Sequence, residues 1–209
     1  MTASSTPSFD RGKPFYPLVM NYVTLLVGFK ELAIRGLLGK PSLDAALDKI
    51  GGMADASADQ IDELRKGLSK LSGPLELKSE LSGGYITFDI DEVSSEIAQN
   101  SSYLAEFLMR SAGSVLVLAH ELSKSQPWRD TGPVWEFLRH CRNAAAHGGK
   151  FHLLHGEPTK PAYWGQMQLT TQLHGTPLFK ESGGGGLLSP GDVIRLLYDI
   201  ERAYPQMTA

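Results

Sequence analysis

Apolar residues recur at steps of three and four along most of the chain, which is the spacing of helices that bury one face. The first such stretch covers residues 17–38, and shorter ones are predicted over residues 43–50 and 57–71. A long stretch over residues 91–123 is interrupted near Asn100-Ser101. In its longer half, one stripe is predicted to form the buried face: Leu104, Leu108, Ser111, Val115, Leu118 and Leu122.

Two further helices are marked by their start and stop residues. Pro133 suits a first helical turn, and Gly148-Gly149 can adopt the left-handed conformation that ends a helix. We call the helix between them the motif helix. The loop before it, residues 125–130, is short, so the motif helix should pack antiparallel on the preceding helix. Ser189, with Asp192 three positions on, predicts a capped final helix.

Three short stretches alternate as strands do. Residues 85–88 follow a Ser-Gly-Gly turn, which fits either a small hairpin or an extended linker. Residues 151–154 and 167–173 are predicted to pair as a hairpin beside the motif helix. The expected fold is mainly α, a bundle of five to seven helices with a small β-hairpin insertion after the motif helix. A single domain over residues 14–209 should follow a disordered tail, residues 1–13, rich in Ser, Thr and Pro.

The composition is that of an ordinary soluble globular protein, with 42% hydrophobic and 21% charged residues. The single cysteine, Cys141, excludes an internal disulfide, and the first residues lack a signal-peptide pattern, so a cytoplasmic location is expected. The longest apolar run, residues 18–29, contains Asn21 and is too short to span a membrane. We therefore expect a buried helix there and no membrane association.

Charge is unevenly distributed along the chain. The net charge of −3 argues against indiscriminate nucleic-acid binding. Residues 41–100 contain twelve acids against five Lys or Arg, whereas residues 138–180 contain five Lys or Arg, five His and one acid, Glu157. The second segment could attract a polyanion that the rest of the surface repels.

The motif helix carries more polar groups than a core helix needs. Its last turns hold five hydrogen-bonding side chains and no carboxylate: Arg139, His140, Arg142, Asn143 and His147. On an ideal helix His140, Asn143 and His147 share one edge about 60° wide, and Arg142 lies about 140° from His147. A facing second copy of the helix could bring an arginine and a histidine together.

These groups fit the cleavage of RNA by its own 2′-OH, which needs a proton acceptor, a proton donor and cationic donors on the phosphate. The imidazole of His147 could accept or donate the proton near neutral pH. The planar guanidinium of Arg142 matches two phosphate oxygens, and Asn143 could hold the imidazole tautomer or a substrate hydroxyl. This chemistry requires no metal and no cofactor.

The run Arg142-Asn143-Ala144-Ala145-Ala146-His147 resembles the signature of the HEPN superfamily, which is Arg, a polar residue, three or more residues and His. HEPN domains are all-helical domains of prokaryotic toxins, abortive-infection proteins and RNA-processing enzymes. The resemblance implies a metal-independent endoribonuclease that works as a homodimer through its motif helices, as a toxin or phage-defence effector with an antitoxin as a further partner. Many members are inactive, so the alternative is a non-catalytic module that binds RNA, a nucleotide or a protein.

Four residues complete the predicted RNA-binding surface: Arg139, His140, Lys150 and Trp164. Cations suit phosphates, and aromatic rings stack on unpaired bases. Each residue also has a structural interpretation, since Arg and His near a helix end can bind the last carbonyls and Trp164 could cover the core. His152 and His155 belong to no coherent set of four ligands, so no metal site is predicted.

Overall fold

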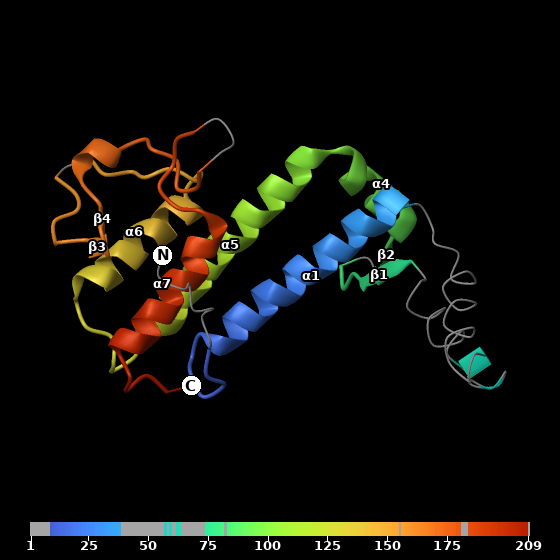
Figure 1. Cartoon of the computed structure of the whole chain (residues 1–209), viewed down its shortest axis with the longest axis horizontal. Coiled ribbons are helices and arrows are strands. Elements are labelled where there is room, and N and C mark those ends of the chain that lie inside the picture. The colour runs from blue at the N-terminus through green and yellow to red at the C-terminus, as the bar shows by residue number, and fades with distance from the viewer. Residues whose placement is uncertain are drawn as a thin grey trace, which may run out of the picture. The chain divides into compact units, whose positions relative to one another are not determined.

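The computed structural model describes residues 9–38, 57, 59, 62–63, 74–81, 83–154, 156–180 and 184–208. In this part of the chain there are five α-helices and two antiparallel sheets of two strands each (Figure 1). The prediction of a mainly α fold with a small β-hairpin is therefore confirmed. The helix predicted over residues 43–50, and all but four residues of the one predicted over 57–71, lie outside the described residues.

The chain divides into two compact units, Met1–Leu25 with Ala105–Ala209, and Leu26–Leu104. We call them the larger and the smaller unit. Two long helices contribute residues to both: α1 (Tyr16–Leu38) and α5 (Ser101–Ser123). The candidate residues all lie in the larger unit.

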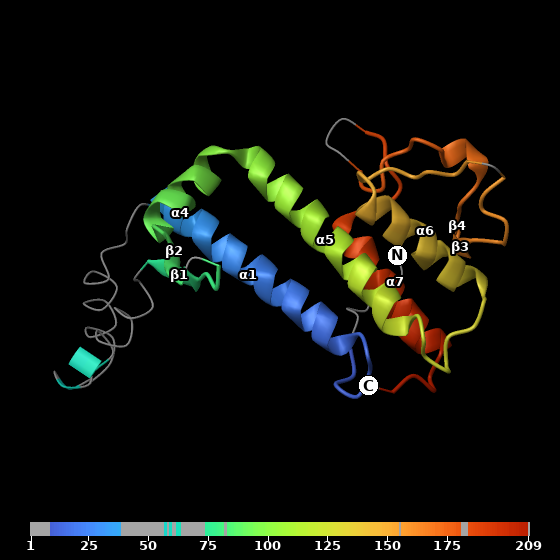
Figure 2. The same ribbon diagram turned by 180° about the vertical axis from the view of Figure 1, so that it is seen from behind.

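In the larger unit, α6 (Pro133–Ala146) and α7 (Pro190–Ala203) pack with the second half of α5, as the views from both sides show (Figures 1 and 2). The predicted cap of α7 is confirmed, because the backbone N–H of Ser189 donates to the Asp192 carboxylate at 2.7 Å. The fully buried side chains of the two C-terminal helices are mostly large and apolar: Trp135, Phe137, Leu138, Cys141, Leu196, Leu197 and Ile200.

α5 buries a different face from the predicted one. Leu118 is 52% exposed and Leu122 is 40% exposed, so the predicted stripe is wrong. The buried positions are Ala112, Gly113, Val115, Leu116, Ala119, His120 and Ser123, of which only Val115 belongs to the predicted stripe. Apolar residues surround this helix, and tertiary packing selects the side with small residues because small side chains let another helix approach closely. A Cβ placed on Gly113 of α5 would lie 3.4 Å from the Ala145 Cβ of α6.

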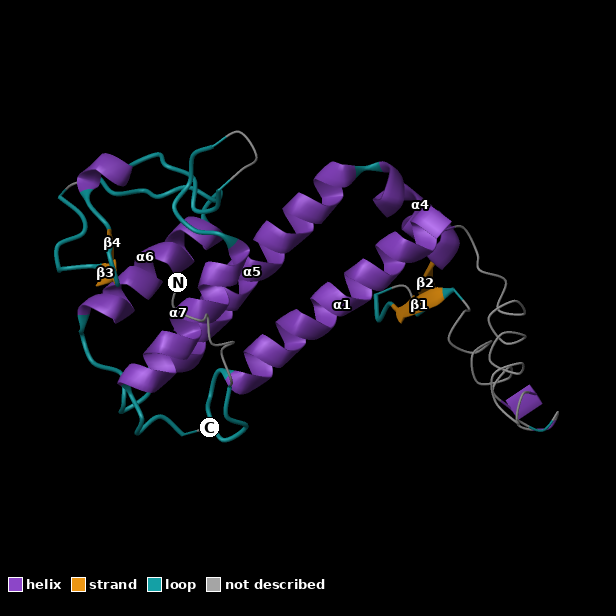
Figure 3. Ribbon diagram, viewed as in Figure 1, coloured by secondary structure: helices purple, strands orange, loops and turns teal. Residues whose placement is uncertain are grey.

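The segment after α6 is mostly loop (Figure 3). Residues 151–154 do not pair with residues 167–173, so this predicted pairing is wrong. The backbone N–H of Phe151 donates to Thr176 at 2.9 Å, and that of Gly175 donates to Phe151 at 2.8 Å. The hairpin in this segment joins β3 (Tyr163–Trp164) and β4 (Met167–Gln168), followed by the short 3-10 helix Thr171–Leu173. Gly165, at φ 56°, allows the tight turn between the strands, so the first strand of the hairpin lies later in the chain than predicted.

Residues 9–13, expected to belong to the disordered tail, contact the C-terminal segment of the same unit. The ring of Phe9 lies 5.7 Å from that of Tyr198, centroid to centroid. The Lys13 ammonium donates to the carbonyls of Pro205 and Met207 at 2.7 and 2.9 Å. These contacts hold the beginning and end of the described chain together.

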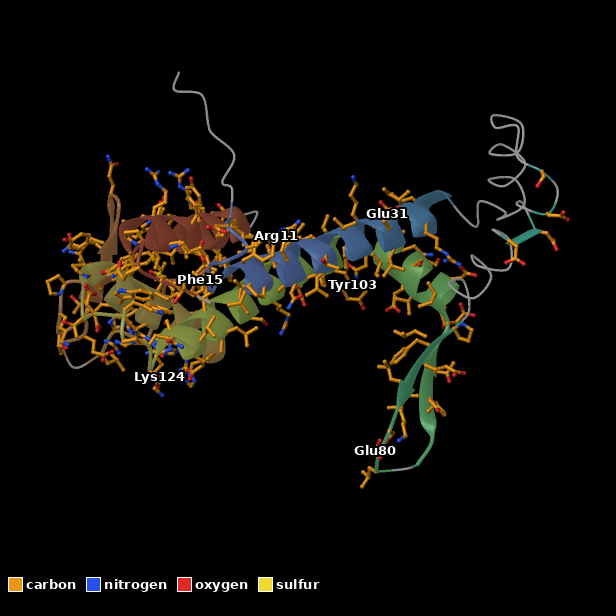
Figure 4. All side chains as sticks on the ribbon, turned by 90° about the horizontal axis from the view of Figure 1, so that it is seen from below. Arg11, Phe15, Glu31, Glu80, Tyr103 and Lys124 are labelled. Atoms are coloured by element: carbon orange, nitrogen blue, oxygen red, sulfur yellow. The ribbon has the colours of Figure 1, made fainter. Side chains whose placement is uncertain are left out.

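In the smaller unit, the hairpin alternative for residues 85–88 is the one found. β1 (Leu75–Lys78) pairs with β2 (Tyr85–Phe88), and Glu80 lies at the far end of the hairpin (Figure 4). Asp89 then caps α4 (Ile90–Gln99) by accepting hydrogen bonds from two backbone N–H groups. Arg35 of α1 donates to Asp91 at 2.9 Å, which ties α4 to α1.

Most of α1 is exposed, so the prediction of a buried helix is wrong. Val19 and Tyr22 are buried, but Met20, Val23 and Val27 are each more than 40% exposed. Apolar residues surround the helix, and its described neighbours cover only part of its circumference. By length and composition alone, the helices over residues 16–37 and 102–123 could each cross a membrane. The expected absence of membrane association stays a prediction.

Candidate functional site

The two glycines predicted to terminate α6 follow its last residues in the structure. The helix stops at Ala146, and His147 is the capping residue, with φ −124° and ψ 61°. Gly148 and Gly149 follow at φ 81° and 74°, and the Gly149 N–H donates to the Ala144 carbonyl at 2.8 Å. His147 is therefore outside the regular helix, which changes its direction relative to Asn143.

Arg142 is anchored on α5. Its guanidinium donates to the Glu121 carboxylate at 2.7 Å and to the side-chain oxygen of Asn143 at 3.2 Å. Its Nε is buried and has no hydrogen-bond partner in the described part of the chain. Contacts between residues 121 and 142 and between 113 and 145 run in opposite order along the two helices, so α5 and α6 are antiparallel, as predicted.

Glu121 is a site residue that the sequence analysis missed. The motif helix carries no carboxylate in its last turns, and α5 supplies one from 21 positions earlier. The hydrogen bond from Arg142 lowers the pKa of Glu121. His120 Nδ1 lies 3.5 Å from the same carboxylate, and burial and Arg129 lower the pKa of that imidazole. At neutral pH the cluster is thus an arginine–glutamate ion pair beside a neutral histidine.

The side chain of His147 is exposed and makes no hydrogen bond with any described residue. Its backbone is engaged, because the N–H donates to the Asn143 carbonyl at 3.0 Å and the carbonyl lies 3.2 Å from His152 Nε2. Arg142 and His147 of one chain form no direct contact, which agrees with the wide angle expected between them. The structure therefore brings Arg142 and Asn143 together and leaves His147 separate, free to meet a substrate or a second protein chain.

Arg139 and His140, predicted to contact RNA, are used within the fold. His140 is only 2% exposed, so its side chain does not reach the surface beside Asn143 and His147. Burial, then the neighbouring Arg139, lowers the pKa of His140. Arg139 lies 3.0 Å from His140 Nε2 and donates to Glu136 at 2.9 Å. Phe137, Cys141 and Ala144, which flank His140 on the helix, are also buried, so this side of α6 faces the core.

Trp164 covers the core, which is the structural role considered for it from the sequence. Its indole N–H donates to Asp199 at 3.1 Å, and its ring lies 6.0 Å from Phe137, so it covers the core next to α7. Lys150, in contrast, is exposed, and its ammonium forms no ion pair with a described residue. Of the four residues predicted to bind RNA, Lys150 is the one whose cation remains open.

A groove of about 860 Å³ lies beside the end of α6. One wall is α5, with Arg110, Ser114 and Leu118 among its lining residues. The chain that directly follows His147, residues 148–150, forms another side together with residues 177–179. The sequence analysis missed this groove because it is formed by three segments that are distant along the chain.

Within the described residues, no group of three or more His, Cys, Asp or Glu side chains could hold a metal ion. His155, half of the His-x-x-His pair, lies outside the described residues. Cys141 is buried in the core, and burial raises the pKa of its thiol, so it is not available as a thiolate. The metal-independent mechanism stays a prediction.

Comparisons with family models, with curated proteins and with solved structures found no match to this chain. The resemblance to the HEPN superfamily therefore depends on the residues of the motif helix alone.

Proposed function

We propose that this protein is a metal-independent endoribonuclease of the HEPN type that cleaves single-stranded RNA. The observation that carries the proposal is the contrast between two side chains of one motif. Arg142 is held by Glu121 and Asn143 with its side chain 27% exposed, and the nearby His147 is exposed and unbonded. A fixed cation and a free imidazole are two of the groups that this reaction requires.

The reaction needs only proton transfers and a phosphate-binding cation. His147 accepts the proton of the 2′-OH, whose oxygen forms a bond to the adjacent phosphorus as the bond to the 5′-oxygen breaks. Arg142 donates to the phosphate oxygens, where negative charge increases in the transition state. The leaving 5′-oxygen takes a proton from water, and the protonated His147 returns its proton to the hydroxide that remains. The products are a 2′,3′-cyclic phosphate and a 5′-hydroxyl.

The distance between these residues in one chain favours a site completed by a second copy. In a two-fold dimer through the motif helices, Arg142 of each chain faces His147 of the other, so each of the two sites holds one guanidinium and one imidazole. The biological role that we propose is that of a cytoplasmic toxin or phage-defence effector, with an antitoxin protein as a further partner.

Incubation of the protein with total RNA and with single-stranded oligonucleotides in EDTA tests the enzyme proposal. We expect cleavage that leaves cyclic-phosphate ends, and a loss of about 100-fold or more in His147→Ala, since removing an acid–base catalyst has effects of that size. The matched control is His174→Ala, an exposed imidazole outside the motif, which should retain activity. If wild type and His147→Ala are equally inert on all RNAs, or equally active, the enzyme proposal is wrong.

One observation favours the alternative, a non-catalytic module that binds RNA, a nucleotide or a protein. The Glu121 carboxylate neutralises Arg142, as it would in a purely structural ion pair. In that case wild type binds RNA without turnover, Arg142→Ala weakens binding, and affinity falls steeply with salt if phosphates are contacted.

A further inference from the structure

We infer that the groove beside the end of α6 binds the RNA strand next to the cleaved bond, with Arg110 and Lys150 on its phosphates. This inference rests on the proposed function, because it places the substrate of that same site. It assigns binding residues outside the motif, two cations that come from different elements and are 40 positions apart in the chain.

The groove is continuous with the candidate site along α5. Arg110, Ser114, Val117 and Leu118 line it, and they lie on one face of the helix because they recur at steps of three and four. Glu121, which anchors Arg142, is the next residue of that face. On the opposite side the groove is lined by Gly148, directly after His147. A strand lying in the groove would therefore lead to both motif residues.

The charge of the groove suits a polyanion. Arg110 and Lys150 are exposed, and Glu106 is the one acid among the described lining residues. The Glu106 carboxylate lies 3.4 Å from Arg110 Nε, and both side chains are more than half exposed, so solvent screens this pair. Lys150 has no such partner among the described residues. The lining thus carries a net positive charge on a protein whose net charge is −3.

The shape of the groove suits a nucleotide. Its volume of about 860 Å³ falls within the range of small-molecule sites and could hold one or two nucleotides. Gly148 and Gly149 leave open space where side chains would otherwise project, so a phosphodiester could approach their backbone. Val117, Leu118 and Phe179 provide apolar surface for the face of a base.

Charge also favours RNA over a second copy of the chain as the occupant. A two-fold contact places the same patch against itself, so Arg110 and Lys150 of both copies would lie in one interface with only Glu106 of each copy to offset them. A nucleic-acid strand supplies one negative charge for each phosphate and needs no such offset.

The experiment measures the affinity of the full-length protein for a single-stranded 2′-O-methyl RNA, which cannot be cleaved, by fluorescence anisotropy at several salt concentrations. The test variant is Arg110→Gln with Lys150→Gln. The matched control is Arg195→Gln with Lys160→Gln, because Arg195 is also an exposed helix arginine paired with an acid four residues on, and Lys160 is also an exposed loop lysine. Both double variants remove the same charge.

We expect the groove variant to bind about tenfold or more weakly, with a salt dependence reduced by about two phosphate contacts, while the control stays near wild type. A second variant, Ser114→Phe, fills the groove without changing its charge and should also weaken binding. Equal affinity in the wild type and the groove variants would overturn the inference. So would a groove substitution that changes the oligomeric state in sedimentation, since that outcome assigns the groove to a second copy.

Failure of the inference and failure of the proposed function are distinguishable. If the wild type cleaves RNA and the groove variants bind like wild type, the enzyme proposal stands and the groove assignment is wrong. If no RNA is cleaved but binding of the 2′-O-methyl strand depends on Arg110 and Lys150, the groove assignment stands and the enzyme proposal is wrong.

Discussion

At the scale of single residues, the pKa values of two side chains on α6 and α5 are both lowered, with opposite effects on their charge. Burial lowers the pKa of His140, so the folded protein holds this imidazole neutral. A hydrogen bond from Arg142 lowers the pKa of Glu121, so the folded protein holds this carboxylate charged. The first side chain affects stability, and the second positions a candidate catalytic group.

His140 makes stability depend on pH. Its pKa in the folded state is below the ordinary value of about 6.5, so the unfolded chain binds the proton first as the pH falls. The stability it contributes is present above pH 6.5 and is lost as the pH falls towards the folded pKa. Between pH 7 and pH 5, denaturant unfolding should show the wild type losing on the order of 1 kcal/mol more than His140→Gln, which cannot titrate. Identical losses in both proteins would contradict a buried neutral imidazole.

Glu121 should act as a positioning residue for Arg142. Glu121→Gln weakens the anchor of the guanidinium, and a small displacement of a catalytic group can cost up to about 100-fold in rate. We expect kcat to fall by roughly 10- to 100-fold with little change in KM, and with an unchanged melting temperature because Glu121 is exposed. Glu92→Gln, an exposed acid on α4, is the control. If KM instead rises by a similar factor while kcat is unchanged, Glu121 contributes to substrate binding.

At the scale of elements, two glycines of α1 have opposite environments. A Cβ on Gly36 would overlap the backbone carbonyl of Ser94 and the side chain of Ala98 on α4, whereas a Cβ on Gly28 would meet no atom of a described residue within 4 Å. Gly36 thus permits the close packing of α1 on α4, and Gly28 has no such role.

Paired alanine substitutions test this difference. Gly36→Ala should destabilise the smaller unit by about 1–3 kcal/mol, because two backbones must separate. Gly28→Ala should be neutral or stabilising by up to about 1 kcal/mol, because alanine favours the helix and no clash results. Thermal or denaturant unfolding of the two variants gives the comparison, and equal effects would show that α1 and α4 do not pack closely.

At the scale of the whole molecule, we propose a site that is completed by a second copy of the chain. If Arg142 of one chain acts with His147 of the other, Arg142→Ala and His147→Ala are each inactive alone. Refolded together in equal amounts, they form mixed dimers in which one of the two sites is intact. Such a mixture should recover about a quarter of the wild-type activity, since half of the dimers are mixed and each has one working site. No recovery would place both residues in a site within one chain.

The sequence predicts correctly those features of the fold that depend on residues close together in the chain. Pro133, the Gly148-Gly149 pair and the Ser189–Asp192 cap mark helix ends correctly, because capping acts over a few positions. The strand at residues 85–88 was also recognised, because its alternating pattern is local. The hydrogen bond between the side chains of Arg142 and Asn143 was not predicted, because Asn143 was expected to hold the imidazole of His147 or a substrate hydroxyl.

Only the tertiary structure decided which groups meet across distance in the chain. It selected the buried face of α5, placed His140 in the core and paired Arg142 with Glu121, 21 positions away. A helix with apolar residues on several sides gives no unique inward face by periodicity, so packing partners make that choice. The groove follows the same principle, since its walls come from separate segments and no single stretch of sequence encodes its shape.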